Sequence, residues 1–235
     1  MPDGLTTIPY KAFNGCGLES LTIPETVTTI EDQAFCAGTF DKLIIPNSVT
    51  SIGMLAFGAN DNLKKVSLGS GLYGFNYDAF YNCHNIESFT VSSNNQHLSS
   101  YNGMVYDKQM TTLKRCPSGL KDDPKDIFAS TLKSIGAYAF EYCQFETLHL
   151  PEGLTGILNM GVYYCPNLTS VYLPSTLTAL NCASFGECYS VTYMKYNGTV
   201  EQWGRIYKEG APRNWDKGLD NLTEIVCLDG TVSIK

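Results

Sequence analysis

A repeat of 22 or 23 residues runs through most of this 235-residue chain and constrains its fold more than any other feature. The most regular position of the repeat holds an apolar residue, usually phenylalanine. These positions are Phe13, Phe35, Phe57, Phe80, Phe140, Val162 and Phe185. A fixed period of this length is typical of a solenoid, in which each repeat forms one coil and the coils bury their apolar faces by stacking.

Each repeat has the pattern of one coil. Residues 21–23 (Leu-Thr-Ile) alternate as a short strand does, and Pro24 ends the pairing because proline has no backbone N–H. Apolar residues then follow at three-residue steps, at Val27 and Ile30, which favours turns or 3₁₀ pieces over an α-helix. We therefore expect one parallel sheet, turns or 3₁₀ pieces on the other wall, and a spine of phenylalanine rings facing the sheet.

Several residue types recur in fixed register within the repeat. The fullest copies contain Ile45-Pro46, Val49, Ile52-Gly53 and Ala56-Phe57 and, at the end of a later unit, Ala139-Phe140 with Cys143. With this pattern the chain resembles the BspA-like leucine-rich repeats over roughly residues 1–192, apart from one insertion. The resemblance implies a right-handed leucine-rich-repeat coil. It also implies a secreted or surface-displayed protein that binds other proteins or mediates adhesion.

The repeat divides the chain into four parts. We expect N-terminal repeats over residues 1–92, a β-hairpin insertion over 93–124, C-terminal repeats over 125–192 and a C-terminal cap over 193–235. The sequence therefore predicts one solenoid with a decoration and a closed end.

The insertion and the cap each allow two interpretations. Residues 104–106 and 111–113 read as two strands of a projecting hairpin, which either covers apolar surface or acts as a contact arm through Tyr106. In the cap, Trp203 and Trp215 either close the last coil or form a separate ligand-binding element, because exposed tryptophan also stacks against protein and carbohydrate partners.

Charge and hydropathy limit the partners and the compartment. The formal net charge of −7 is opposite in sign to what a phosphate backbone requires, so we expect no nucleic-acid partner. No stretch approaches the roughly 18 consecutive apolar residues that predict a membrane-spanning helix. Met1 and Pro2 fall where a repeat has its last strand residue and proline, so we expect the chain to begin inside a repeat, without the signal peptide of a secreted protein.

The nine cysteines do not suggest a metal site or a disulfide framework. Five of them share one repeat position, three residues after the phenylalanine or its substitute: Cys16, Cys83, Cys143, Cys165 and Cys188. We expect buried, reduced thiols there, with Asn60 at the same position in another unit. Cys36, Cys116, Cys182 and Cys227 are off this register and are candidates for exposed thiols. No C-x-x-C pair occurs, so no metal site is expected.

Motifs for cofactors and catalysis lack their structural context. Residues 69–74 fit G-x-G-x-x-G, but Gly69 takes the proline slot of the repeat and no helix follows to receive a pyrophosphate. His84, His97 and His149 fall in different repeats, and neither G-x-S-x-G nor H-E-x-x-H occurs. We therefore expect no cofactor, no catalytic residues and no enzymatic activity.

Strand alternation nominates a binding surface. Because Leu148 and Leu150 point inward, His149 must point outward, and the same argument places Tyr172 outside. Applied to the other repeats, the argument gives Thr22, Ile44, Ser67, Thr90, Ile127 and Thr192 as outward residues. Neighbouring strands would then bring Ile127, His149 and Tyr172 side by side as a hot spot, with Ile44 on the same face. A plain solvated sheet face is the alternative.

The leading functional hypothesis is a non-catalytic module that binds a protein through the solenoid sheet face, with a glycan as the second candidate ligand. One alternative is a polysaccharide-processing or glycan-binding protein with a parallel β-helix. Such a helix needs three strands per coil, whereas each repeat here predicts a single strand. The other alternative is a structural spacer that holds further domains away from a cell envelope.

Overall fold

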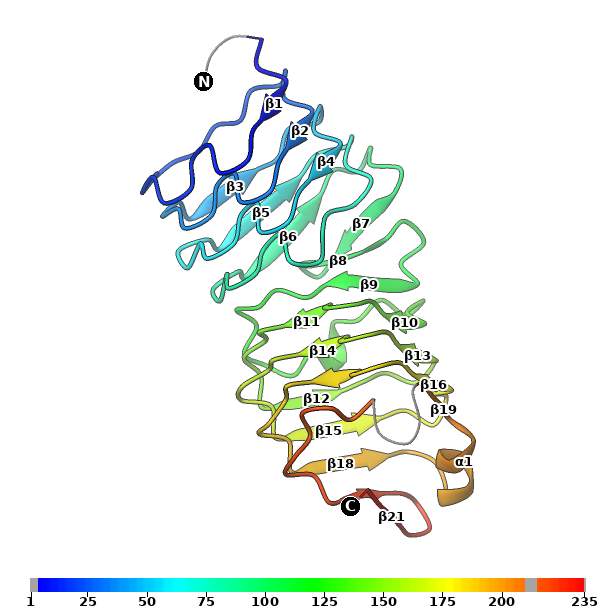
Figure 1. The fold of residues 1–235 in the computed structure, drawn as a ribbon. Coiled ribbons are helices and arrows are strands. Elements are labelled where there is room, and N and C mark those ends of the chain that lie inside the picture. Colours follow the sequence, from blue (N-terminus) through cyan, green and yellow to red (C-terminus); the bar gives the residue numbers. More distant parts are fainter. Residues whose placement is uncertain (1–3, 210–214, 235) are drawn as a thin grey trace. The chain divides into compact units, whose positions relative to one another are not determined.

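The computed structural model describes residues 4–209 and 215–234, so Met1, Pro2 and part of the predicted cap lie outside the described residues. Successive repeats form stacked coils, as Figure 1 shows. The chain divides into two compact units. Unit 1 comprises Met1–Gln109 and Pro117–Gly119, and unit 2 comprises Met110–Cys116 and Leu120–Lys235.

The described part of unit 1 forms two narrow parallel sheets and one hairpin. The first sheet consists of β1 (Thr7–Ile8), β2 (Thr29–Ile30) and β4 (Ser51–Ile52). The second sheet consists of β3 (Lys42–Ile44), β5 (Lys65–Leu68) and β6 (Ser88–Val91). β7 (Leu98–Tyr101) and β8 (Met104–Asp107) pair antiparallel, so the insertion contains a hairpin.

In unit 2 three strands of each coil pair with the next coil. The first ladder consists of β9 (Thr112–Arg115), β10 (Ser134–Ile135), β13 (Gly156–Ile157), β16 (Ala179–Leu180) and β19 (Tyr207–Lys208). The second consists of β11 (Phe140–Glu141), β14 (Val162–Tyr163) and β17 (Phe185–Gly186). The third consists of β12 (Thr147–His149), β15 (Ser170–Leu173), β18 (Tyr193–Tyr196), β20 (Glu224–Val226) and the antiparallel β21 (Thr231–Ser233).

The described residues of unit 2 also form two short helices. The 3₁₀ helix η1 (Pro124–Asp126) precedes the first full coil. The α-helix α1 (Val200–Arg205) begins at Thr199, whose hydroxyl accepts from the Gln202 N–H while the Gln202 side chain accepts from the Thr199 N–H. This reciprocal capping stabilises a helix of a length that would otherwise be marginal.

The parallel strands that the repeat predicts are present as β3, β5 and β6 in unit 1 and as β12, β15 and β18 in unit 2, in two separate sheets, but residues 21–23 form no strand. The structure adds further narrow ladders on other walls of the coil, so one strand per repeat was too few. The two-residue ladders form at Thr29-Ile30 and its equivalents, where the sequence pattern predicts turns. Residues with positive φ, such as Gln33 (56°) and Leu55 (53°), bend the chain after each of these pairs. Because the coils stack in register, the extended segments between the bends lie beside each other and can pair. This pairing is favoured since a backbone N–H buried between coils needs an acceptor.

The phenylalanine spine is confirmed and takes different forms in the two units. In unit 1 the rings of Phe13 and Phe35 stack at 5.2 Å, and those of Phe35 and Phe57 at 5.5 Å, with interplanar angles of 3° and 6°. In unit 2 Val162 interrupts the series. Phe140 there packs edge to face against Phe128 and Phe145, and it is fully buried. The spine is therefore core in both units.

The repeated cysteine position lies inside the turn, as predicted. The Cys83 thiol donates to the Phe57 carbonyl at 3.0 Å, the Cys165 thiol donates to the Phe140 carbonyl at 3.0 Å, and the amide of Asn60 donates to the Phe35 carbonyl. Cys143 and Cys188 are also buried. Only the first member, Cys16, is exposed. Among the off-register cysteines, Cys116 and Cys227 are buried, so the suggestion that they are exposed is wrong.

These thiols should resist alkylation in the folded protein. Burial raises the pKa values of Cys143 and Cys165, and a thiol that is both buried and protonated is a poor nucleophile. We expect N-ethylmaleimide to label Cys16 promptly, and to label Cys143 and Cys165 only after denaturation, as peptide mass spectrometry would show. Prompt labelling of either buried thiol without denaturant would contradict the interior assignment.

The glycine-rich motif at residues 69–74 has a packing role. A Cβ atom at Gly69 would overlap the Pro46 carbonyl group, and one at Gly71 would overlap the Asn47 carbonyl oxygen. Both glycines therefore let one coil approach the preceding coil closely.

Candidate functional site

The outward side of β12, β15 and β18 carries two rows of side chains, which we call the sheet face. One row consists of Thr147, Ser170 and Tyr193, and the other of His149, Tyr172 and Lys195. Residues between the rows, such as Leu148 and Val171, are buried. The alternation confirms that His149 and Tyr172 point outward, because successive side chains of a strand face opposite sides.

Three aromatic rings lie together on the sheet face. The rings of His149 and Tyr172 are stacked, with centroids 3.8 Å apart and an interplanar angle of 9°. Tyr193 lies 5.8 Å from Tyr172 at a tilt of 56°. The side chain of His149 is 39% exposed, so a partner can reach the imidazole ring. The stack presents a preformed aromatic surface to solvent.

Asp123 fixes the orientation of His149. One carboxylate oxygen accepts from the backbone N–H of Lys125, which caps η1, and from the backbone N–H of His149 at 3.1 Å. The other oxygen contacts Nδ1 of the imidazole. This contact turns Nδ1 towards the carboxylate and Nε2 away from it.

The strand that was expected to carry Ile127 beside His149 is not present, because Ile127 follows η1 as its C-cap residue and lies outside any strand. The side-chain contact to the imidazole that the structure shows comes from Asp123. The helix η1 takes the place of the strand that a regular coil would have here, although the 22-residue step persists on another wall, where Ser134 pairs with Gly156. β12 is consequently an edge strand, and the Asp123 side chain occupies part of the position of a neighbouring strand.

The sequence pattern also missed Tyr193 and Lys195. Thr192 was expected to face outward on the last strand, but β18 begins at Tyr193, and Lys195 pairs with Tyr172. The signal was available, because Lys195 lies 23 residues after Tyr172 and stands between buried Met194 and Tyr196.

Ile44 is exposed, as expected, but belongs to unit 1. It is 53% exposed on β3 and pairs with Ser67 of β5. The hydroxyl of Thr90 donates to the hydroxyl of Ser67 at 3.0 Å. The outward rows of this sheet are polar apart from Ile44 and contain no aromatic residue.

The alternative contact residues are buried. Tyr106 is inaccessible within β8, and its hydroxyl contacts the Met104 sulfur, so the hairpin does not present it to a partner. Trp203 packs edge to face against Tyr196 and Trp215, and both tryptophans are buried. The interpretation of this segment as a cap that covers apolar area is thereby favoured over a tryptophan contact site.

A polar hollow adjoins the sheet face in unit 2. Its lining includes Asp123 and Thr147, together with Asp122, Gln144, Glu146 and Asn167. Thr147 is also part of the sheet face, so the hollow and the ring stack form one continuous surface. A partner that covers His149 can place polar groups in the hollow.

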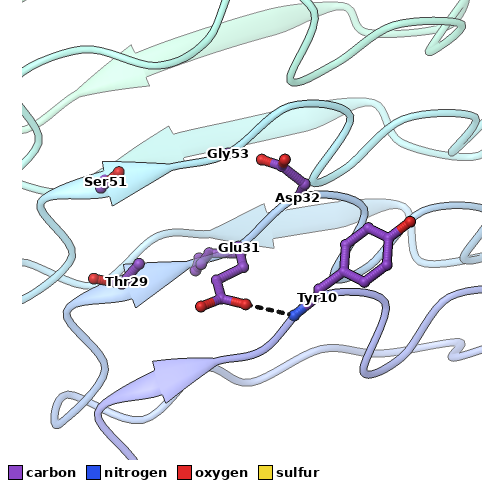
Figure 2. A pocket seen from close by; sticks show the side chains of 7 residues that line it. Tyr10, Thr29, Glu31, Asp32, Ser51 and Gly53 are labelled. Atoms are coloured by element: carbon purple, nitrogen blue, oxygen red, sulfur yellow. Dashed lines mark hydrogen bonds between the residues drawn. The ribbon is translucent and has the colours of Figure 1, made fainter.

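Unit 1 has a second hollow beside β2 and β4, shown in Figure 2. Two neighbouring carboxylates lie there, but each serves a backbone group. Glu31 accepts from the N–H of Tyr10 at 2.7 Å, and Asp32 accepts from the N–H of Met54 at 2.7 Å. The acidic pair therefore joins successive coils.

The described residues contain neither a group of metal-binding side chains nor a membrane-spanning helix. Within residues 4–209 and 215–234, no three histidine, cysteine or acidic side chains lie in a group that could hold a metal ion. In the same residues, no helix has the length and apolar character needed to cross a bilayer.

Comparison with known families identifies the repeat. The family model described as the BspA type leucine rich repeat region matches six copies, over residues 1–102 and 125–206. The chain belongs to this family. The unmatched segment between the two ranges falls within the predicted insertion. No curated protein matches the sequence.

Solved structures share the fold of this BspA-type protein. A leucine-rich repeat protein from Eubacterium ventriosum superposes with a TM-score of 0.74 at 21% identity, covering 96% of this chain and 64% of that one. The pneumococcal vaccine antigen PcpA gives 0.63 at 19% identity, covering 86% and 54%. A leucine-rich repeat protein from Bacteroides ovatus gives 0.54 at 20% identity, covering 95% and 58%. The chain thus spans less than two thirds of each, and the likeness shows the fold alone.

Proposed function

We propose that this protein is a non-catalytic module, displayed on or released from a bacterial surface, that binds a protein partner through the sheet face of unit 2. The family supports the general role of an interaction module. The ring stack of His149 on Tyr172 is the observation that carries the choice of surface. Aromatic side chains give a large contact area for little loss of conformational entropy, and tyrosine is enriched at binding hot spots.

The geometry also supports a preorganised contact. Asp123 holds the imidazole through Nδ1, and Tyr172 covers one of its faces, so the ring loses little freedom when a partner binds. Lys195 and the polar hollow supply charged and hydrogen-bonding groups around the rings. An aromatic centre with a polar rim is the arrangement expected of a protein-binding surface.

A partner found by screening the chain on protein and glycan arrays would be titrated against substitutions on this surface. His149→Ala and Tyr172→Ala should each weaken binding by at least about 1 kcal/mol, roughly fivefold in Kd, because each removes part of the stack. Ile44→Ala, at an exposed sheet position of unit 1, is the control and should leave Kd unchanged. Undiminished affinity in both sheet-face variants would reject the proposal.

A further inference from the structure

A second aromatic surface lies on another wall of unit 2. The members of this tyrosine patch come from three successive coils and are Tyr138, Tyr142, Tyr163, Tyr164 and Tyr189. Ring centroids of Tyr142 and Tyr164 are 4.8 Å apart, and those of Tyr138 and Tyr163 are 5.2 Å apart. Tyr164 is 38% exposed and Tyr189 is 49% exposed. The patch therefore offers ring area to solvent as well as to neighbouring rings.

The fold does not require tyrosine at these positions. Tyr142 and Tyr164 stand two residues after the spine position, with φ values of 57° and 48°. The same position in unit 1 holds Ala37 and Ala59, with φ values of 58° and 53°. Alanine therefore satisfies this bend, and the two phenol rings are additions that the backbone does not need.

Neighbouring backbone makes room for the rings. Tyr163 continues the ladder to Gly186, where a Cβ atom would lie 3.0 Å from the Tyr163 ring. The backbone N–H of Tyr164 donates to the Gly186 carbonyl at 2.9 Å, which keeps the two coils in register. The glycine thus lets the Tyr163 ring lie against the backbone of the next coil.

Two carboxylates adjoin the exposed end of the patch. Glu187 occupies the position of Tyr142 and Tyr164 in the next coil. The cap brings Asp220 close, because the Asn221 side chain donates to the Tyr189 carbonyl at 2.7 Å. Partial burial and then the charges of Glu187 and Asp220 raise the pKa of the Tyr189 phenol. Tyrosine faces and negative charge therefore occur together.

We propose that the tyrosine patch, with Glu187 and Asp220, binds an arginine-containing segment of a partner protein. A guanidinium group stacks on aromatic faces and also matches a carboxylate with two parallel hydrogen bonds, which a lysine ammonium cannot do. The net charge of −7 also favours a basic segment over an acidic one. This surface differs from the sheet face, so either proposal can fail without the other.

A fluorescent peptide of alternating arginine and glycine, titrated into the full chain by anisotropy, tests the assignment. Binding should weaken as salt rises, because the attraction is partly between exposed charges. Tyr164→Ala and Tyr189→Ala should each raise Kd at least about fivefold through loss of ring contact. The double variant Glu187→Gln with Asp220→Asn should remove most of the salt dependence. A lysine-for-arginine peptide should bind several-fold more weakly.

Controls separate this surface from other causes. Tyr164→Ala places at this bend the residue that Ala37 and Ala59 already supply, so it should fold, and a thermal melt checks this. Tyr172→Ala on the sheet face should leave peptide binding unchanged. The proposal is overturned by absence of peptide binding, by equal binding of the lysine peptide, or by binding that survives both tyrosine substitutions. Equal loss in Tyr172→Ala would assign the peptide to the sheet face instead.

Discussion

Replacing Phe140 by alanine is expected to lower the free energy of unfolding by about 3–5 kcal/mol, which is the usual cost of deleting a buried aromatic ring. The ring is fully buried and lies between the edges of Phe128 and Phe145, at 6.1 and 5.7 Å. Phe128 lies in the segment between η1 and β10, and Phe145 in the segment between β11 and β12, so the ring is packed between two connecting segments. Thermal melts and urea titrations of the variant measure the loss.

Leu228→Ala provides the matched comparison. Leu228 is an apolar residue of the same unit but is 65% exposed, so its truncation should change stability by no more than about 0.5 kcal/mol. If the Phe140→Ala protein had the same melting temperature as the parent protein, the spine would contribute little to stability, contrary to what its burial predicts.

The periodic part of the fold could be predicted from the sequence because a solenoid repeats one local solution. The ring at Phe140, the interior thiol at Cys165 and the outward position of Tyr172 all follow from counting in steps of 22 or 23 residues. Each depends only on contacts between adjacent coils. The additional narrow ladders were missed because two residues per strand are too few for alternation to show.

The failures cluster where the period is interrupted. Asp123 lies 26 residues before His149 and belongs to the insertion, so no step of the repeat brings the two together. Trp203 and Tyr106 were considered as contact residues because large aromatic side chains suit both cores and interfaces, and sequence alone does not separate these uses. The tyrosine patch escaped notice because its members stand at turn positions or, for Tyr163, in a two-residue strand, where the repeat pattern places no requirement.

Arg115 and Glu141 form an ion pair inside unit 2, and breaking it should be as damaging as removing the spine ring. The guanidinium Nη1 lies 2.6 Å from the carboxylate, and the side chains are 2% and 1% exposed. Nη1 also donates to the Tyr138 carbonyl at 3.3 Å. Arg115→Met or Glu141→Leu alone should cost about 3–5 kcal/mol, because each leaves an uncompensated charge in the interior.

The double variant tests whether the ion pair itself stabilises the fold, or whether each charge only prevents the other from being buried unpaired. When both charges are removed, no unpaired ion remains, so Arg115→Met with Glu141→Leu should cost much less than either single change. Urea titrations of the four proteins give the coupling energy directly. Arg205 and Glu201, a pair whose side chains are 74% and 75% exposed, supply the contrast, and Arg205→Met should change stability by about 0.5 kcal/mol or less. Two small single effects would show that water reaches the pair. A double variant as unstable as the sum of the singles would instead show that methionine and leucine cannot fill the space, and that the pair is kept for its shape as much as for its charge.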